Sequence, residues 1–123
     1  IETELFLISC EIYKNLQFLE KNHLLKPKLT QIFRRTDFLV FGSFAKGSQT
    51  KGSDLDLVIF SEDKKVKNLV EENLKKVHAQ YIEFDEFLKL YNKQKNLVIE
   101  IIKNHVLFGK YKEIVGLMME WVK

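Results

Sequence analysis

The feature that most constrains this chain is a polar stretch enclosed by two short apolar runs, residues 38–41 and 57–60. Each run is rich in aromatic or β-branched residues and is bounded by turn residues, which predicts two buried strands. Between them, Gly42 permits a sharp bend, Ser43 can act as the N-cap of a short helix, and Gly47 can end that helix in the left-handed conformation. The sequence therefore predicts a strand, a bend, a short helix, a loop and a second strand.

The polar stretch also carries residues that suit a phosphate and a metal ion. A strand followed by Gly42 and Ser43 at a helix start offers free backbone N–H groups, which favour a phosphate. Asp54 and Asp56 are two residues apart, so on a strand both project from one face while the adjacent leucines face the core. Two adjacent carboxylates repel each other unless a cation or a proton lies between them. Hard oxygen ligands beside a phosphate site indicate Mg²⁺ and the chemistry of phosphoryl or nucleotidyl transfer.

This arrangement resembles the signature of a known family. Gly42-Ser43, ten further residues and then Asp54-Leu55-Asp56 resemble the pattern of the polymerase-beta-type nucleotidyltransferases. Residues 44–47 and 53–57 also match the minimal prokaryotic branch of that family, position by position. The resemblance implies an α+β fold in which helices flank a small mixed β-sheet. It further implies that Asp54 and Asp56 are the catalytic pair and ligate one or two Mg²⁺ ions.

The resemblance also implies a phosphate-binding set. Gly42 and Ser43 would hold the β- and γ-phosphates of ATP or another nucleoside triphosphate. Lys46 stands near the same loop and would counter the phosphate charge; the alternative is a surface lysine at a helix end. Ser53 belongs to the set by position, although its place before the second strand favours a role in ordering the turn.

Active members of the family add a third carboxylate from a later strand, beside the first two. Aligning residues 81–84 with the end of the family pattern puts Gln80 at this position. A neutral amide is a poorer Mg²⁺ ligand than a carboxylate and does not act as a base. Glu83, Asp85 and Glu86 are the alternatives in another register. Glu83, however, is three residues from Gln80 and so faces the other side of a strand.

The length of 123 residues suits one domain spanning residues 1–123 with its own core. Hydrophobic periodicity divides it into an N-terminal helix, a core and a C-terminal helix, at residues 2–24, 28–109 and 112–123. Within the core, we expect helices at 28–35, from about 63 to 77, at 85–91 and at 96–104, and strands at 78–82 and 106–108. The apolar side of the C-terminal helix is expected to be core, with a homodimer seam as the alternative. The chain begins without methionine, which leaves a missing upstream domain as an open alternative.

Charge and composition narrow the classes of partner. The net charge of +3 favours an anionic substrate, but only two of the 20 cationic residues are arginines, which disfavours a nucleic-acid surface. The single cysteine, Cys10, excludes an intramolecular disulfide and agrees with a reducing cytoplasm. No apolar stretch approaches the length of a membrane span. The three histidines have no Cys or His neighbour at zinc-ligand spacing, so we expect no zinc site.

Two functional hypotheses follow. The first is Mg²⁺-dependent transfer of a nucleoside monophosphate, AMP from ATP, to a hydroxyl of a partner protein or a small molecule. The family resemblance implies that such a partner is an RNase-like toxin, with this chain as its antitoxin. The second is a catalytically weak or inactive module that binds a nucleotide or a partner, because Gln80 takes the third-acid position.

Overall fold

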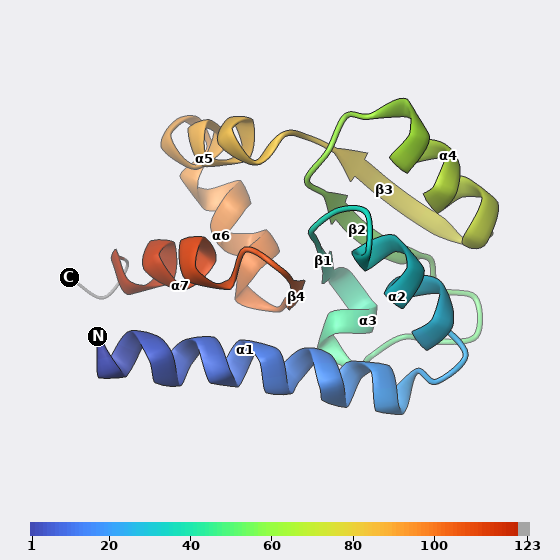
Figure 1. Cartoon of the computed structure of the whole chain (residues 1–123), viewed down its shortest axis with the longest axis horizontal. Coiled ribbons are helices and arrows are strands. Elements are labelled where there is room, and N and C mark those ends of the chain that lie inside the picture. The colour runs from blue at the N-terminus through green and yellow to red at the C-terminus, as the bar shows by residue number, and fades with distance from the viewer. Residues whose placement is uncertain (121–123) are drawn as a thin grey trace.

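The computed structural model describes residues 1–120, which form four strands and seven helices. The strands assemble into one sheet in the order β3-β2-β1-β4 (Figure 1). They are β1 (Phe38–Phe41), β2 (Leu55–Ile59), β3 (Val77–Tyr81) and β4 (Val106–Phe108). β1 runs antiparallel to both of its neighbours, whereas β2 and β3 are parallel. A small mixed sheet flanked by helices confirms the predicted α+β fold.

One face of the sheet is covered by helices from the first half of the chain. They are α1 (Glu2–Lys21), α2 (Lys26–Phe33), α3 (Gly42–Lys46) and α4 (Lys64–Asn73). Of these, α1 also contacts β4 and the last helix of the described chain. Alternate side chains of β1 and β2, including Phe38, Val40 and Leu57, point to this side. They meet Leu29 and Ile32 of α2 in a core from which solvent is excluded. Burial of apolar surface, at about 25 cal/mol per Å², is the main term that holds these layers together.

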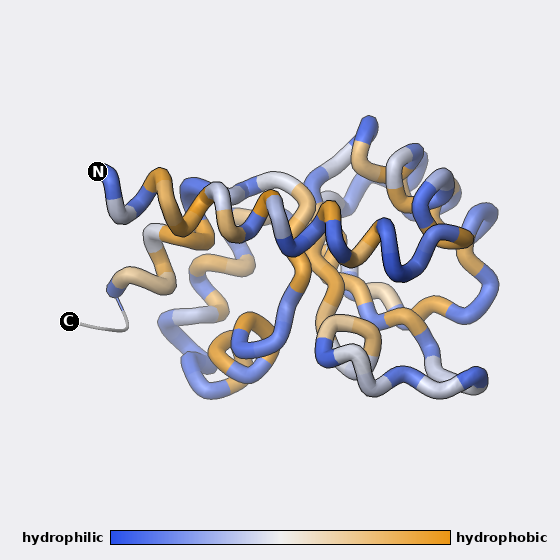
Figure 2. Tube along the Cα trace, turned by 90° about the horizontal axis from the view of Figure 1, so that it is seen from below, coloured by the Kyte–Doolittle hydropathy of each residue, from blue (hydrophilic) through white to orange (hydrophobic). Residues whose placement is uncertain are grey.

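The opposite face is covered by helices from the second half of the chain. They are α5 (Phe84–Lys93), α6 (Lys95–Lys103) and α7 (Tyr111–Glu120). Leu39 and Val58 of the sheet meet Phe87 of α5 and Ile102 of α6 in a second core. The strands at the centre of the molecule are hydrophobic and the outer loops hydrophilic in Figure 2. Because side chains alternate along a strand, Asp56 shares this second face with Val58.

A buried polar link joins α1 to the segment that leads into β4. Glu11 and His105 are each only 4% exposed, and Oε1 of Glu11 lies 2.5 Å from Nε2 of His105. Nζ of Lys14 lies 3.3 Å from the other carboxylate oxygen of Glu11. Burial raises the pKa of Glu11, but the hydrogen bond and charge of His105, together with Lys14, outweigh it, so this pKa lies below its ordinary value of 4.5.

Four predicted boundaries differ from the structure, and one of them is the second strand, which lies at Leu55–Ile59 and not at residues 57–60. The N-terminal helix ends at Lys21, where the backbone N–H of Asn22 still donates to the carbonyl of Phe18 before the chain turns. The second helix begins at Lys26, since a proline is tolerated in the first turn of a helix. The fourth helix ends at Asn73, and β3 then begins at the residue predicted to end that helix.

The remaining elements lie close to their predicted places. The strands and helices predicted between residues 78 and 108 are confirmed to within two residues. The predicted C-terminal helix corresponds to α7, and its residues 121–123 lie outside the described part of the chain. Within residues 1–120, no helix has both the length and the apolar character needed to cross a membrane.

Candidate active site

The bend after β1 lies against the second aspartate of the motif. Gly42 has a φ of +72°, and a Cβ built on it would lie 2.2 Å from Oδ2 of Asp56. The sheet register explains the contact, because Phe41, the last residue of β1, pairs with Asp56 on β2. Only glycine allows the backbone to take this conformation and to approach the carboxylate so closely. The structure thus brings the bend and this aspartate together, as the sequence predicts.

The short helix α3 begins at the bend. Its N-cap is Phe41 and makes no side-chain cap hydrogen bond, so the prediction that Ser43 caps the helix is wrong. The physical reason is the positive φ of Gly42, which turns the chain into the helix one residue earlier and leaves Ser43 in the first turn. Gly47 ends the helix in the left-handed conformation, as predicted. The N–H groups of the first turn have no acceptor within a helix, and they lie at the bend that touches Asp56.

The two aspartates differ in their exposure. Asp56 lies within β2, and 25% of its side chain is exposed, whereas Asp54 precedes the strand and is exposed. Leu55, between them, is buried in the first core, which turns Asp56 toward the other face of the sheet. Asp56 is therefore the aspartate that the fold holds against the bend, and Asp54 stands at the solvent end of the strand.

The neighbour of Asp56 on β3 is a histidine. The parallel register pairs Asp56 with His78 and Val58 with Gln80, so the prediction that Gln80 takes the position beside the aspartates is wrong. Gln80 lies on the predicted face of β3 but two residues further along the strand than His78. The alternation of side chains along a strand determines the face on which a residue lies, but it does not determine which residue of the next strand it pairs with. Nδ1 of His78 lies 3.4 Å from Oδ1 of Asp56. The sequence pattern did not predict that His78 lies beside Asp56. Starting the third strand at Val77 would have paired Val77 with Leu55 and therefore His78 with Asp56.

The three alternative acids lie beyond the end of β3. Glu83 is the N-cap residue of α5, and its carboxylate accepts a hydrogen bond from the backbone N–H of Glu62 at 3.1 Å. Asp85 and Glu86 follow in the first turn of α5, and Glu86 contacts Lys89 at 3.2 Å. The position beside Asp56 in the β2–β3 ladder is therefore taken by His78 and by none of these acids.

The two remaining predicted residues lie away from the bend. The side-chain oxygen of Ser53 accepts a hydrogen bond from the backbone N–H of Thr50 at 2.8 Å, so Ser53 orders the turn before β2. Lys46, in the last turn of α3, lines a cavity of about 300 Å³ that α1 also borders. Lys14 and Lys21 of α1 line the same cavity, so this side of α3 carries a positive potential.

An open cavity of about 680 Å³ borders the site on the second face of the sheet. Its apolar lining comes from the sheet, from the segment after β3 and from α5 and α6: Phe41, Val58, Ile82, Phe87, Leu90, Leu97 and Ile101. His78 and Gln80 line it from β3, and the exposed residues Glu62 and Glu86 add negative charge. The volume lies in the range of small-molecule sites, and His78 connects the cavity to Asp56.

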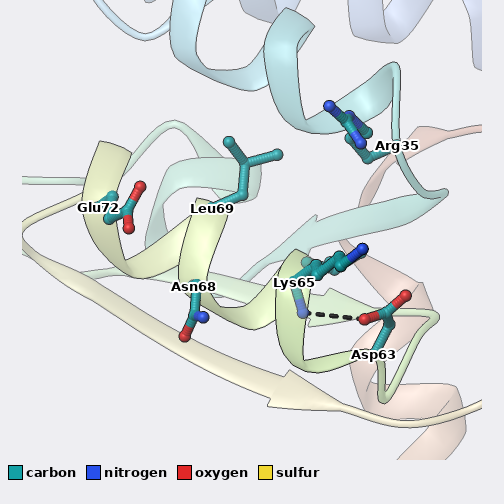
Figure 3. A pocket seen from close by; sticks show the side chains of 7 residues that line it. Arg35, Asp63, Lys65, Asn68, Leu69 and Glu72 are labelled. Carbon is teal, nitrogen blue, oxygen red and sulfur yellow. Dashed lines mark hydrogen bonds between the residues drawn. The ribbon is translucent and has the colours of Figure 1, made fainter.

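A separate cavity of about 400 Å³ lies beside α4 and the end of α2 (Figure 3). Arg35 and Lys65 bring positive charge to it, and Asp63 and Glu72 bring negative charge. The carboxylate of Asp63 accepts a hydrogen bond from the backbone N–H of Lys65 at 2.9 Å and so caps α4. No residue of the Gly-Ser and Asp-x-Asp motif lines this cavity, and its charges balance, so we assign no function to it.

Comparison with known proteins identifies the family of this chain. The family model of the nucleotidyltransferase domain matches residues 24–116, which is more than half of the chain. The chain belongs to this nucleotidyltransferase family. A candidate protein adenylyltransferase of Methanocaldococcus jannaschii is 41% identical over 78 residues, which are 62% of this chain and 57% of the relative. The chain thus matches less than two thirds of that relative's length, and no solved structure shows a significant match.

The carboxylates of this nucleotidyltransferase domain fit a hard divalent cation. In nucleotide sites, Mg²⁺ is bound by one or two carboxylates, with substrate phosphates and water as the other ligands. Asp54 and Asp56 offer that donor set beside N–H groups that favour a phosphate. Within residues 1–120, no group of three or more His, Cys, Asp or Glu side chains is arranged to hold a metal ion. The two aspartates would therefore need further ligands, among them phosphate oxygens and water.

Proposed function

We propose that this nucleotidyltransferase domain transfers AMP from ATP to a hydroxyl group of a partner protein or a small molecule. The observation that carries the proposal is the contact between Gly42 and the carboxylate of Asp56. It sets a turn that favours a phosphate and a side chain that favours a cation in one place. The name of the Methanocaldococcus jannaschii relative, a candidate protein adenylyltransferase, supports AMP as the group and a protein as its acceptor.

The order of the strands suits an in-line displacement. In such a reaction, the acceptor oxygen attacks the α-phosphorus from the side opposite the departing pyrophosphate. We place the β- and γ-phosphates at Gly42 and Ser43 after β1, the α-phosphate beside Asp56 on β2, and the acceptor on the β3 side near His78. These strands are consecutive in the sheet. A bond forms from the acceptor oxygen to phosphorus, the bond to the bridging oxygen breaks, and the hydroxyl proton passes to solvent.

Several groups of the protein would compensate the negative charge of the triphosphate. Asp54 and Asp56 would hold a divalent cation, Mg²⁺ by the family resemblance, which when bound would neutralise charge that develops as pyrophosphate leaves. The amides at Gly42 and Ser43 would bind the leaving phosphates. Lys46 lies among lysines beside α3, whose positive potential attracts a triphosphate to this side of the site.

The cavity of about 680 Å³ is the proposed acceptor site. Its apolar walls suit an uncharged group, whereas Glu62 and Glu86 repel a triphosphate. The triphosphate and the acceptor would therefore approach Asp56 from opposite sides. A protein acceptor would give this domain the role implied by its family resemblance, an antitoxin that modifies an RNase-like toxin in the cytoplasm.

Radioactively labelled ATP tests the proposal. The domain is incubated with ATP labelled at the α-phosphate, a divalent metal salt, and the proteins and metabolites of its own cells as acceptors. We expect label on an acceptor, and at least a 100-fold loss of label with Asp56→Asn, in line with the loss of one charge-stabilising group. Asp63→Asn is the matched control, because Asp63 is exposed and asparagine caps a helix equally well. Full activity of Asp56→Asn, or no label on any acceptor, would contradict the proposal.

A second candidate function is nucleotide binding without turnover. The observation that favours it is His78, which pairs with Asp56 at the position where the family resemblance implies a third carboxylate. Calorimetry separates the two functions, because a binding module takes up ATP with a divalent cation but releases no pyrophosphate. Release of pyrophosphate in the presence of an acceptor would exclude this second candidate.

A further inference from the structure

The distance between Asp56 and His78 does not match a hydrogen bond. Nδ1 of His78 and Oδ1 of Asp56 lie 3.4 Å apart, whereas N–H···O hydrogen bonds span about 2.7 to 3.2 Å. Two atoms that bind one cation at about 2.1 Å each, at an angle of about 90° to 109°, lie about 3.0 to 3.4 Å apart. The observed separation lies within the range of an ion pair, and it is also the separation of two ligands of a shared ion.

Apolar residues of β2 and β3 fix the positions of Asp56 and His78 relative to each other. Asp56 and His78 are direct partners in the parallel ladder of β2 and β3. The pairs on either side, Leu55 with Val77 and Leu57 with Ala79, belong to the first core, which fixes the two strands against each other.

The side chains of Asp56 and His78 differ in how far the surrounding protein restricts them. The Asp56 side chain lies against Gly42 and is 25% exposed, whereas 66% of the His78 side chain is exposed. The imidazole can therefore adjust to an ion that Asp56 has already bound.

We propose that Asp56 and His78 together bind a divalent transition-metal ion, and that the site therefore prefers Mn²⁺ or Co²⁺ to Mg²⁺. The inference rests on the proposed function, because it uses the same carboxylate. Imidazole nitrogen is a good ligand for first-row transition ions, whereas Mg²⁺ prefers oxygen ligands alone. Mn²⁺ accepts carboxylate oxygen as well as imidazole, and phosphate oxygens and water complete its shell.

Metal binding in the absence of nucleotide tests this preference directly. Mn²⁺ binding is followed by the loss of the electron paramagnetic resonance signal of free Mn²⁺, and Mg²⁺ binding by competition against Mn²⁺. We expect His78→Ala to weaken Mn²⁺ binding by about tenfold or more and to change Mg²⁺ binding much less. His78→Asp should restore an all-oxygen site, so the ratio of Mn²⁺ affinity to Mg²⁺ affinity should fall by about tenfold or more.

A second readout and a control make the test specific. Co²⁺ bound to the protein should show a visible absorption band that changes with His78→Ala, because the band depends on the ligands of the ion. His23→Ala is the matched control, since His23 is exposed in the connection between α1 and α2 and should leave both measurements unchanged. Far-ultraviolet circular dichroism checks that each variant is folded.

The possible outcomes separate this inference from the proposed function. If the ratio of Mn²⁺ affinity to Mg²⁺ affinity is the same in the wild-type domain and in His78→Asp, the inference is overturned. His78 would then be an ion-pair partner of Asp56 only. Nucleotidyl transfer can be present in that case, so the proposed function would stand. Conversely, a metal preference that changes with His78 supports the inference even where no acceptor is labelled.

Discussion

At the residue scale, two glycines of the motif loop share a backbone conformation and differ in their surroundings. Gly42 has a φ of +72° and Gly47 a φ of +74°. A Cβ on Gly42 would overlap the carboxylate of Asp56, whereas a Cβ on Gly47 would meet no atom within 4 Å. The pair therefore separates the cost of a left-handed conformation from the cost of losing the contact with Asp56.

We predict that Gly42→Ala destabilises the domain and abolishes ATP binding. A non-glycine residue in this conformation costs about 1 to 3 kcal/mol, and the overlap with Oδ2 of Asp56 adds to this because the carboxylate must move. Gly47→Ala should show the conformational cost alone and should bind ATP within about threefold of wild type, a factor that corresponds to less than 1 kcal/mol. Urea unfolding and calorimetry with ATP measure the two effects. Equal ATP affinities for the two variants would contradict the role of the Gly42–Asp56 contact.

At the element scale, local patterns predicted the elements well and one register poorly. The strand over Phe38–Phe41 and the bend at Gly42 follow from residues that are adjacent in the chain, so they could be predicted. The start of β3 could not be predicted in this way, because Val77 continues the apolar spacing of the preceding helix and yet belongs to the strand. Register across a parallel crossover depends on tertiary packing, which no local pattern encodes. For this reason the place of Asp56 against the bend at Gly42 was predictable, and that of its neighbour His78 was not.

The buried pair of Glu11 and His105 links α1 to the segment before β4. We predict that Glu11→Gln lowers the free energy of unfolding at pH 7 by about 3 kcal/mol, because it removes one partner of a buried pair. Glu20→Gln is the control on the same helix, since Glu20 is exposed and should change stability by less than about 0.5 kcal/mol. Urea unfolding at pH 7 measures both variants, and an equal effect would contradict a structural role for the pair.

The lowered pKa of Glu11 adds a pH dependence to this link. Because the folded pKa lies below the ordinary value of 4.5, ionised Glu11 stabilises the fold fully above that pH. The contribution is lost as the pH falls below 4.5 and passes through the folded pKa. We therefore predict that the difference in stability between wild type and Glu11→Gln is largest at pH 5 to 7 and shrinks below pH 4.5. A difference that stays constant down to pH 3 would contradict this assignment.

At the scale of the whole molecule, the sheet separates two charge environments. Lysines of α1 and α3 line a cavity beside the short helix that follows β1, whereas Glu62 and Glu86 line the apolar cavity beside β3. Asp56 on β2 lies between these regions, since β2 is the central strand of the three. A triphosphate and an acceptor that approach from opposite sides would meet at Asp56 in the geometry that an in-line displacement requires.

This division predicts that filling the apolar cavity affects the acceptor and not the nucleotide. Leu97 on α6 is 47% exposed and lines the cavity, so Leu97→Trp can occupy part of its volume without entering the core. We expect ATP affinity within about twofold of wild type and about a tenfold loss of AMP transfer, because misplacing a reacting group lowers the rate steeply. Leu69→Trp is the matched control, since Leu69 lines the cavity of Figure 3 beside α4 and should leave transfer unchanged in a folded protein. Equal transfer by both variants would place the acceptor elsewhere, and a parallel loss of ATP affinity with Leu97→Trp would place the nucleotide in this cavity instead.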